Sequence, residues 1–375
     1  MNTCNRLEIN INKLRTNINN IIIYAQKINP SVKFCLPVKA DAYGHGLIEI
    51  AKNTADLVDY FAVSCLAEGI TLRKANINHN HILVFGILTP SQIADLIAYN
   101  LEFTISSLAH AQDVLLYCQQ HNKQAKIHIK IDTGMNRVGV KPQSVQTIID
   151  FISLNSNLIK LKGLYSHFAS ADDKSQTGLT QYQIKSFTQL VKSVKSQNPQ
   201  LICHLANSAG LNYKTAIFDM IRPGIISYGY NINNIANLKI SPLLSLKSKI
   251  LNIKEVEANT GISYNHQYQT DSKTQIAIIP IGYGDGYRQS WSNHQVIISD
   301  KFYPIAGRVC MDMTMIDLKN NNNIAIGDEV ILLGQSLRLN ITMQELANLA
   351  NTNIYEILCG FTARLPKIYT FNSNK

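Results

Sequence analysis

The chain has 375 residues, 46% of them hydrophobic, so it can bury one large core and a second, smaller one. Its formal net charge is +10, but the basic residues are spread out rather than clustered, which argues against nucleic-acid binding. No apolar run reaches the roughly 18 residues of a membrane span. The seven cysteines form no CxxC pair and MNTCNRLEIN lacks a signal-peptide pattern, so we expect a cytoplasmic protein without a disulfide framework or zinc cluster.

Short apolar runs alternate with amphipathic segments from about residue 33 to 228. The strand candidates are residues 33–39, 60–64, 81–85, 101–105, 126–132, 161–166, 201–206 and 218–224. Alternating strands and helices are typical of βα units around parallel strands. Eight such units predict a (β/α)₈ TIM barrel over residues 11–235. An open doubly wound sheet is the alternative, but no GxGxxG follows the first strand.

The alternation of strand-like and helical segments ends at about residue 235. Strand-like segments such as 274–284, 294–299 and 328–334 are separated by Gly, Asn and Asp turns, and one short helix candidate lies at 342–350. This pattern predicts a C-terminal, mostly antiparallel β domain over residues 236–375. Residues 1–10 contain the alternating stretch RLEIN, and we expect them to join this β domain rather than the barrel.

Polar residues follow several of the predicted barrel strands. They are Lys39 after the first, Lys130, Asp132 and Arg137 after the fifth, His167 after the sixth, Asn207 and Ser208 after the seventh, and Arg222 to Gly224 at the eighth. Each alone has a structural explanation, since a lone histidine or a buried arginine is more often a packing or ion-pair residue. In a TIM barrel, however, the carboxyl ends of the strands carry the active site, so together these residues predict one site.

The residue types at this predicted rim favour a phosphorylated carbonyl cofactor. A lysine such as Lys39 can form a Schiff base where burial lowers its pKa. The stretches NSAG (207–210) and RPGI (222–225) offer small residues and backbone N–H groups for a phosphate near the last strands. These features predict pyridoxal 5'-phosphate on Lys39. No HExxH, EF-hand or paired-histidine spacing appears, so we expect no metal.

The motifs VKADAYGHG, KIDTGMNRVG, YSHFASAD, HLANSAG, RPGIISYG, GISYN, IPIGYGDGYRQS and AGRVCMDMTMIDL resemble, in order and spacing, those of bacterial alanine racemases. The resemblance runs from about residue 5 to 370. It implies a fold-type III pyridoxal-phosphate enzyme that interconverts L-alanine and D-alanine for peptidoglycan. It also implies a head-to-tail homodimer in which the β domain of one subunit completes the active site of the other.

The resemblance assigns a role to each matching residue. Lys39 is similar to the Schiff-base lysine that also serves as one catalytic base, and Tyr264 to the opposite base, contributed by the second subunit. The remaining matches are Tyr43, Ser208, Gly224, Ile225 and Tyr355 for the phosphate, Arg222 for the pyridine nitrogen with His167 supporting it, Arg137, Met311, Asp312 and Tyr283 for the substrate side, and Lys130 for a carbamylated lysine.

Two alternatives stay open from the sequence. One is a racemase of broader specificity, for example toward serine. The other is a non-catalytic pyridoxal-phosphate-binding protein, a class that consists of single barrels; the long region after residue 235 argues against it. The chain also departs from the family pattern at Asp41, where asparagine is more common, at Gly284, where alanine is, and at Lys367, where arginine is.

Overall fold

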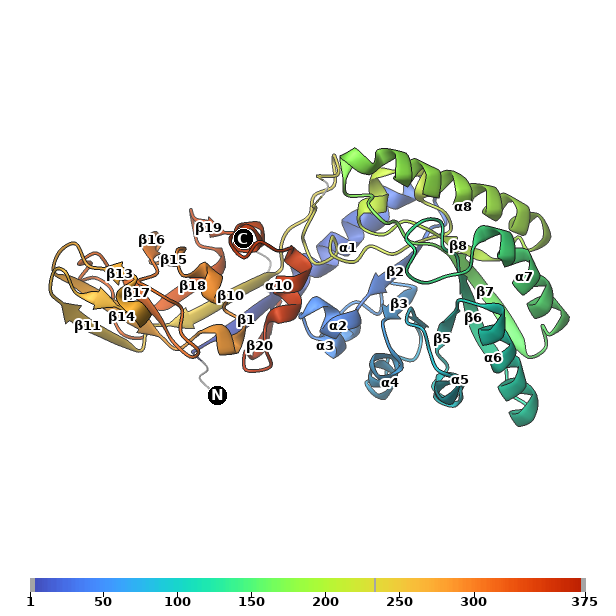
Figure 1. The fold of residues 1–375 in the computed structure, drawn as a ribbon, viewed down its shortest axis with the longest axis horizontal. Helices are drawn as coiled ribbons and strands as arrows, with labels where there is room; N and C mark the ends of the chain where they lie inside the picture. The colour runs from blue at the N-terminus through green and yellow to red at the C-terminus, as the bar shows by residue number, and fades with distance from the viewer. Residues whose placement is uncertain (1–3, 233, 372–375) are drawn as a thin grey trace. The chain divides into compact units, whose positions relative to one another are not determined.

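The structure, a computed structural model, describes residues 4–232 and 234–371. It contains two compact units. The barrel unit comprises Lys13–Ala42 and Gly46–Pro242, and the β unit comprises Met1–Asn12, Tyr43–His45 and Leu243–Lys375. Figure 1 shows the elements of both units.

The barrel unit is built on eight strands that run parallel to their neighbours, in the order β8-β7-β6-β5-β4-β3-β2-β9. Their bounds are β2 Lys33–Pro37, β3 Tyr60–Val63, β4 His81–Val84, β5 Glu102–Ile105, β6 Ala125–Lys130, β7 Ile159–Tyr165, β8 Ile202–His204 and β9 Met220–Ile221. Between β8 and β9, the N–H of Arg222 donates to Ala206 O at 2.8 Å, which nearly closes the sheet into a barrel.

Helices connect most of the strands of the barrel unit. They are α1 Ile11–Gln26, α2 Lys39–Tyr43, α3 Leu47–Lys52, α4 Leu66–Lys74, α5 Ile93–Ala98, α6 Leu108–His121, α7 Val145–Leu154 and α8 Thr177–Gln197, with 3-10 turns η1 Pro90–Gln92, η2 Pro142–Ser144, η3 Lys174–Gln176, η4 Ala209–Asn212 and η5 Lys214–Ala216. Helix α7 illustrates the packing: Val145, Ile148, Ile149 and Ile152 are buried at helical spacing, giving one apolar face.

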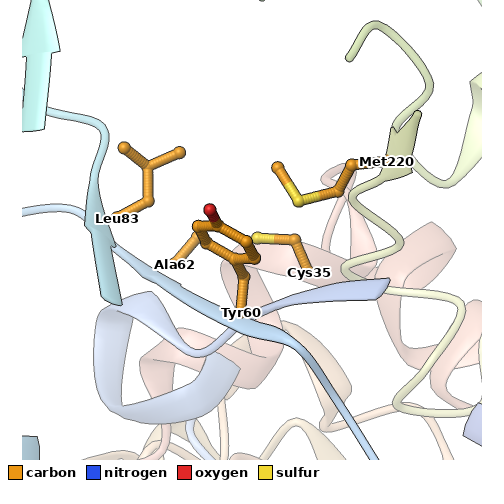
Figure 2. Packing of buried hydrophobic residues seen from close by; sticks show 5 residues of the cluster. All are labelled: Cys35, Tyr60, Ala62, Leu83 and Met220. Atoms are coloured by element: carbon orange, nitrogen blue, oxygen red, sulfur yellow. The ribbon is translucent and has the colours of Figure 1, made fainter. Parts of the chain in front are cut away.

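One part of the barrel core gathers side chains from four strands. Cys35, Tyr60, Ala62, Leu83 and Met220 are buried together, and Figure 2 shows the Tyr60 ring among the other four. Cys35 pairs with Tyr60 in the register of β2 and β3. Because side chains alternate across each strand, such positions recur every second residue along a strand.

The β unit contains a sheet with the order β16-β15-β18-β10-β1-β20, with β19 paired to β18, and two smaller sheets, β11-β14-β17 and β12-β13. The bounds are β1 Arg6–Asn10, β10 Leu244–Lys249, β11 Asn252–Val256, β12 Gly261–Ile262, β13 Tyr268–Gln269, β14 Thr274–Ile279, β15 Gln295–Ile298, β16 Lys301–Pro304, β17 Thr314–Asp317, β18 Glu329–Gln335, β19 Asn340–Ile341 and β20 Lys367–Thr370. Its helices and 3-10 turns are α9 Met343–Leu349, α10 Ile354–Gly360, η6 Tyr264–His266, η7 Tyr283–Asp285 and η8 Gln289–Trp291.

Strand β1 lies inside the sheet of the β unit, antiparallel to β10 and parallel to β20. Its Leu7 and Ile9 are buried, whereas the residues between them are partly exposed. The observed strands confirm the predicted fold class, a (β/α)₈ barrel followed by a mostly antiparallel β domain. The division of the chain at residue 235 stays a prediction.

Helix α10 was not among the predicted elements. The Asn353 side chain caps it by accepting from Glu356 N at 3.0 Å. The sequence Asn-x-x-Glu therefore indicates the start of a helix, although it lies in a region whose pattern predicts mostly strands. In residues 4–232 and 234–371, we find no helix that combines the length and apolar character needed for a membrane crossing.

Candidate active site

Lys39 stands where β2 ends and an unusual turn begins. Ala40, Asp41, Ala42 and Tyr43 all have positive φ, between 53° and 54°. Such left-handed conformations cost about 1–2 kcal/mol per residue outside glycine, so a run of them persists only where the surroundings hold it. The strain marks this turn as a functional segment.

Two carboxylates hold the turn. Glu68 of α4 accepts from Ala40 N and from Ser64 N, each at 2.7 Å. Asp41 accepts from Leu47 N at 2.7 Å and so satisfies a free N–H at the start of α3. An asparagine oxygen could accept the same bond, so Asp41 can serve here where the motif that it resembles more often has asparagine.

Lys130 ends β6 and is only 6% exposed. Its Nζ lies 5.5 Å from the ring centre of Tyr165. Burial, followed by the positive charges of Arg137 and Arg222, lowers the pKa of Lys130 to about 8. The loop that follows is shaped by Asp132, whose Oδ1 accepts from the N–H groups of residues 134, 135 and 136 at 3.0 Å. This loop leads to the exposed Arg137.

Arg222 follows β9 and is 3% exposed. Its Nη2 donates to Ser166 O at 2.6 Å and to Leu205 O at 3.0 Å, while Nη1 donates to His204 Nδ1 at 2.8 Å. Burial lowers the pKa of Arg222 to about 10, which still leaves the guanidinium charged at neutral pH. No described hydrogen bond engages its Nε, so the Nε–H can donate to a ligand.

A second histidine, His204, which sequence analysis did not single out, binds Arg222 directly, and the support predicted for His167 stays a prediction. The His204 ring stacks on Tyr165, with ring centres 4.9 Å apart and an interplanar angle of 4°. Burial, and then the charges of Arg222 and Lys130, holds the pKa of His167 well below its usual range, so His167 is neutral in this positive region.

The segment after β9 presents buried backbone N–H groups. Ser208 Oγ accepts from Ile226 N at 3.4 Å, a long bond. Gly224 and Ile225 are buried, and within the described residues their N–H groups donate to no acceptor. Because buried N–H groups are almost always paired, this arrangement fits an anionic ligand such as a phosphate.

In the β unit, Tyr43 lies against α10. Its ring centre is 6.0 Å from that of Tyr355. The close contact between this segment and α10 requires the residue after Tyr43 to be glycine. A Cβ on Gly44, whose φ is +77°, would lie 2.1 Å from Leu358 O. The two tyrosines predicted to hold a phosphate are thus brought together.

The remaining predicted residues also gather in the β unit. The N–H of Tyr283 donates to Cys310 O at 3.0 Å, and Gly284 N donates to Met311 O at 2.9 Å. Ser263 Oγ donates to Arg308 O at 2.8 Å, which fixes the turn carrying Tyr264 beside the same segment. Tyr264, Tyr283 and Met311 are 64%, 44% and 53% exposed, so they form an accessible surface.

Arg364 is a further member of this group that sequence analysis assigned no role. It forms ion pairs with Asp285 at 3.1 Å and with Asp312 at 2.8 Å. Asp285 is buried and accepts from Gly282 N at 3.0 Å, so Arg364 pairs with a carboxylate that the 3-10 turn η7 holds in place. In the sequence, the indication of a role was the position of this arginine in ARLP, a segment that resembles a turn.

The predicted residues thus fall into two groups, one in each unit. The barrel group is Lys39, Lys130, Arg137, His167, Ser208, Arg222, Gly224 and Ile225, and the β-unit group is Tyr43, Tyr264, Tyr283, Met311, Asp312 and Tyr355. Across the described part of the chain, no cluster of three or more His, Cys, Asp or Glu side chains could hold a metal ion. The barrel group offers an amine, fixed cations and free N–H groups, which suit a phosphorylated carbonyl compound.

Family models match both parts of the chain. The alanine racemase N-terminal domain matches residues 9–232, and the alanine racemase C-terminal domain matches residues 243–369. The chain belongs to the alanine racemase family. This finding confirms the resemblance drawn from the motifs.

Individual relatives of the alanine racemase family match over nearly their whole length. Alanine racemase of Halothermothrix orenii is 38% identical, with 96% of each chain covered. That of Clostridium novyi is 35% identical, covering 97% of this chain and 95% of the relative. Among solved structures, alanine racemase of Clostridium difficile 630 superimposes with a TM-score of 0.90 at 36% identity, covering 99% of this chain and 97% of that chain.

Proposed function

We propose that this protein is a cytoplasmic alanine racemase that interconverts L-alanine and D-alanine with pyridoxal 5'-phosphate held at Lys39. The observation that carries the proposal is the barrel group itself, in a chain of the alanine racemase family. Lys39, the buried Arg222 and the unpaired N–H groups of Gly224 and Ile225 supply what this cofactor needs. The D-alanine would serve peptidoglycan synthesis.

The residues present fit the cofactor. Lys39 Nζ would bond to its carbonyl carbon. Ser208, Gly224 and Ile225, together with Tyr43 and Tyr355, would hold its phosphate. Arg222 Nε would face the ring nitrogen and donate to it, because a guanidinium does not give up its proton at neutral pH. When bound, pyridoxal phosphate withdraws electrons from the bonds at the substrate Cα and so weakens the Cα–H bond.

Racemisation requires a proton to leave one face of Cα and another to arrive on the opposite face. We assign these roles to Lys39 Nζ and Tyr264 Oη, with Tyr264 provided by a second copy of the chain. The exposed surface of Tyr264, Tyr283 and Met311 supports a head-to-tail homodimer, because exposed apolar groups of this kind mark interaction sites. Arg137 would orient the substrate carboxylate, while Asp312, Met311 and Tyr283 would bound the substrate pocket.

Lys130 is the candidate for carbamylation. Its lowered pKa, about 8, makes a neutral amine accessible at moderately alkaline pH. A neutral amine attacks carbon dioxide, forming an N–C bond and releasing one proton, and the resulting carbamate carries a negative charge. The charge of Arg137, which already acts on Lys130, would stabilise that anion. Intact-mass measurement in bicarbonate and in carbon dioxide-free buffer tests the modification.

Incubation of the cofactor-loaded protein with L-alanine in D₂O tests the activity. We expect D-alanine that carries deuterium at Cα, and little product from L-serine or L-lysine in parallel. Comparable turnover of serine would instead support the broader-specificity racemase. Cofactor binding without exchange at Cα would contradict the proposal and support the non-catalytic cofactor-binding class.

A further inference from the structure

A line of hydrogen-bonded side chains crosses the barrel unit from strand to strand and ends at Arg222. Glu102 Oε1 lies 2.7 Å from His81 Nδ1, and Glu102 Oε2 lies 2.8 Å from His128 Nε2. His128 Nδ1 lies 3.1 Å from His204 Nε2, and His204 Nδ1 accepts from Arg222 at 2.8 Å. Glu102 and His81 are the first residues of β5 and β4, whereas Arg222 follows β9, so the line runs from the amino end of the strands to the candidate active site.

Arg222 determines where the protons of this line lie. A guanidinium only donates hydrogen bonds, so His204 Nδ1 must accept and carries no proton. The neutral ring of His204 then bears its proton on Nε2 and donates it to His128 Nδ1. His128 in turn carries its proton on Nε2 and donates it to Glu102 Oε2, a carboxylate oxygen.

The opposite order is excluded by the same contacts. A charged His128 would donate from Nδ1 to His204 Nε2. His204 would then accept at both ring nitrogens and carry no proton, which a histidine ring does not do near neutral pH. Burial and then the charge of Arg222 hold the pKa of His204 well below its usual range, in agreement with a neutral ring. Burial opposes the charge on Glu102, but hydrogen bonds from His128 and His81 hold its pKa well below the ordinary value.

Such a line is unusual inside a barrel, where branched apolar side chains normally fill the interior. His128 and His204 are fully buried, and Glu102 is 1% exposed. The backbone makes room for the line: a Cβ on Gly163 of β7 would lie 2.5 Å from His128 Nδ1. Buried polar groups that are all paired specify one arrangement of their side chains, at a cost that apolar packing would avoid.

We propose that Glu102, acting through His128 and His204, is a positioning residue that fixes the orientation of Arg222 and places a compensating negative charge at the far end of the line. With Nη1 bound by His204 and Nη2 by two backbone carbonyls, the guanidinium plane cannot rotate. Its Nε–H is thereby aimed at the ligand. The identity of this ligand as the ring of pyridoxal phosphate rests on the proposed function. The order of protons along the line is independent of it.

The first test uses the full chain without cofactor. In a protein with ¹⁵N-labelled histidine, two-bond ¹H–¹⁵N spectra at neutral pH distinguish the two neutral tautomers and the charged ring. We expect His128 and His204, assigned through His128→Gln and His204→Gln, to show the neutral Nε2–H pattern. The buried His110 lies outside the line and serves as the internal comparison. An Nδ1–H or charged pattern at either histidine would overturn the proposal.

The second test is Glu102→Gln, which keeps an acceptor for His128 but removes the charge. We expect His204, two hydrogen bonds away, to keep the Nε2–H tautomer that Arg222 imposes but to show shifted ¹⁵N signals, and the affinity for pyridoxal phosphate to fall about tenfold in a spectroscopic titration. Asp59→Asn is the matched control, since Asp59 accepts from Phe34 N beside β3 and lies outside the line. It should change neither the spectrum of His204 nor the affinity.

The outcomes separate the two proposals. Unchanged ¹⁵N signals of both His128 and His204 in Glu102→Gln, with or without a loss of affinity, would refute the role of Glu102. A protein that shows the expected tautomers but binds no pyridoxal phosphate would refute the proposed function and leave the order of protons standing. Glu102→Asp, which shortens the side chain but keeps the charge, should retain more of the affinity than Glu102→Gln.

Discussion

Lys130 is a cation that the barrel buries beside other cations. Between its folded pKa of about 8 and the ordinary value of 10.5, the unfolded chain holds a proton that the folded chain lacks. The free energy of unfolding therefore contains a contribution from Lys130 that rises as pH increases through this window, and that is lowest below it. Retaining a buried cation at a cost in stability is typical of functional sites.

Replacing this lysine tests that assignment. In carbon dioxide-free buffer, we expect Lys130→Met to be more stable than the original protein at neutral pH, by up to about 3 kcal/mol, because the buried charge is gone. The rise in stability between pH 8 and 10.5 should also become smaller. Urea unfolding followed by circular dichroism measures both, with the exposed Lys123→Met as control. An unchanged pH profile would show that the folded barrel does not lower the pKa of Lys130.

Individual residues were predicted where a motif or a strand end identified them. Lys39 and Arg222 could be found because they follow apolar runs that end at the same face of the barrel. His204 could not, because it is one of 10 histidines and its partners His128 and Arg222 are 76 and 18 residues away in sequence. A hydrogen bond between residues so far apart leaves no local pattern.

At the scale of elements, the turn from Ala40 to Tyr43 depends on a helix elsewhere in the barrel. Four consecutive left-handed residues form no stable structure by themselves. Glu68 of α4 binds the turn and the end of β3 at the same time, through Ala40 N and Ser64 N. The orientation of Lys39 is therefore tied to α4, although no feature of the VKADAYGHG sequence indicates this.

Glu68→Gln should loosen the turn without changing the size of the side chain. Glutamine has one acceptor oxygen, so one of the two N–H groups would face a donor instead. We expect a loss of about 1–3 kcal/mol in the free energy of unfolding and weaker cofactor binding. Glu49→Gln, on the neighbouring α3, is the control and should behave like the original protein. Equal stability of the two variants in urea unfolding would rule out this role of Glu68.

Element boundaries were predicted well in the barrel and less well after it. Each barrel strand begins and ends within two residues of its apolar run, except β9, which ends three residues before its run does. In the β unit, β12, β13 and β19 are two residues long, too short for an alternating pattern to appear. The pairing of β12 with β13 is continued beyond the strands by the bond from Asn259 N to Thr270 O at 2.8 Å.

At the scale of the whole molecule, each copy carries both groups of site residues, and the proposed homodimer combines the barrel group of one copy with Tyr264 of another. Lys39→Ala and Tyr264→Phe should each abolish racemisation. After subunit exchange, an equimolar mixture of the two variants should regain about a quarter of the original activity, because one of the two sites in a mixed dimer has both bases and half the dimers are mixed. Racemase assays of the mixture measure this. Exchange of differently tagged subunits without any activity would contradict a shared site.

The order of strand-like and helical segments in the sequence predicts the class of fold. It does not predict which residues of two copies contact each other in a dimer. The +10 charge can be counted in the sequence, and the exposed aromatic side chains can be identified on the surface of the structure. The partner of that surface is set by shape and symmetry, which no sequence spacing encodes.

The position of β1 between β10 and β20 has a consequence for folding during synthesis on the ribosome. Arg6–Asn10 is translated before either of its neighbours, because one neighbour is Leu244–Lys249 and the other is Lys367–Thr370. At about 5–20 residues per second, this strand waits roughly 20–75 s for its second neighbour. During that time the strand that carries the apolar Leu7 and Ile9 lacks at least one of the two strands that flank it in the folded protein, so this part of the nascent chain is vulnerable to aggregation until β20 is translated.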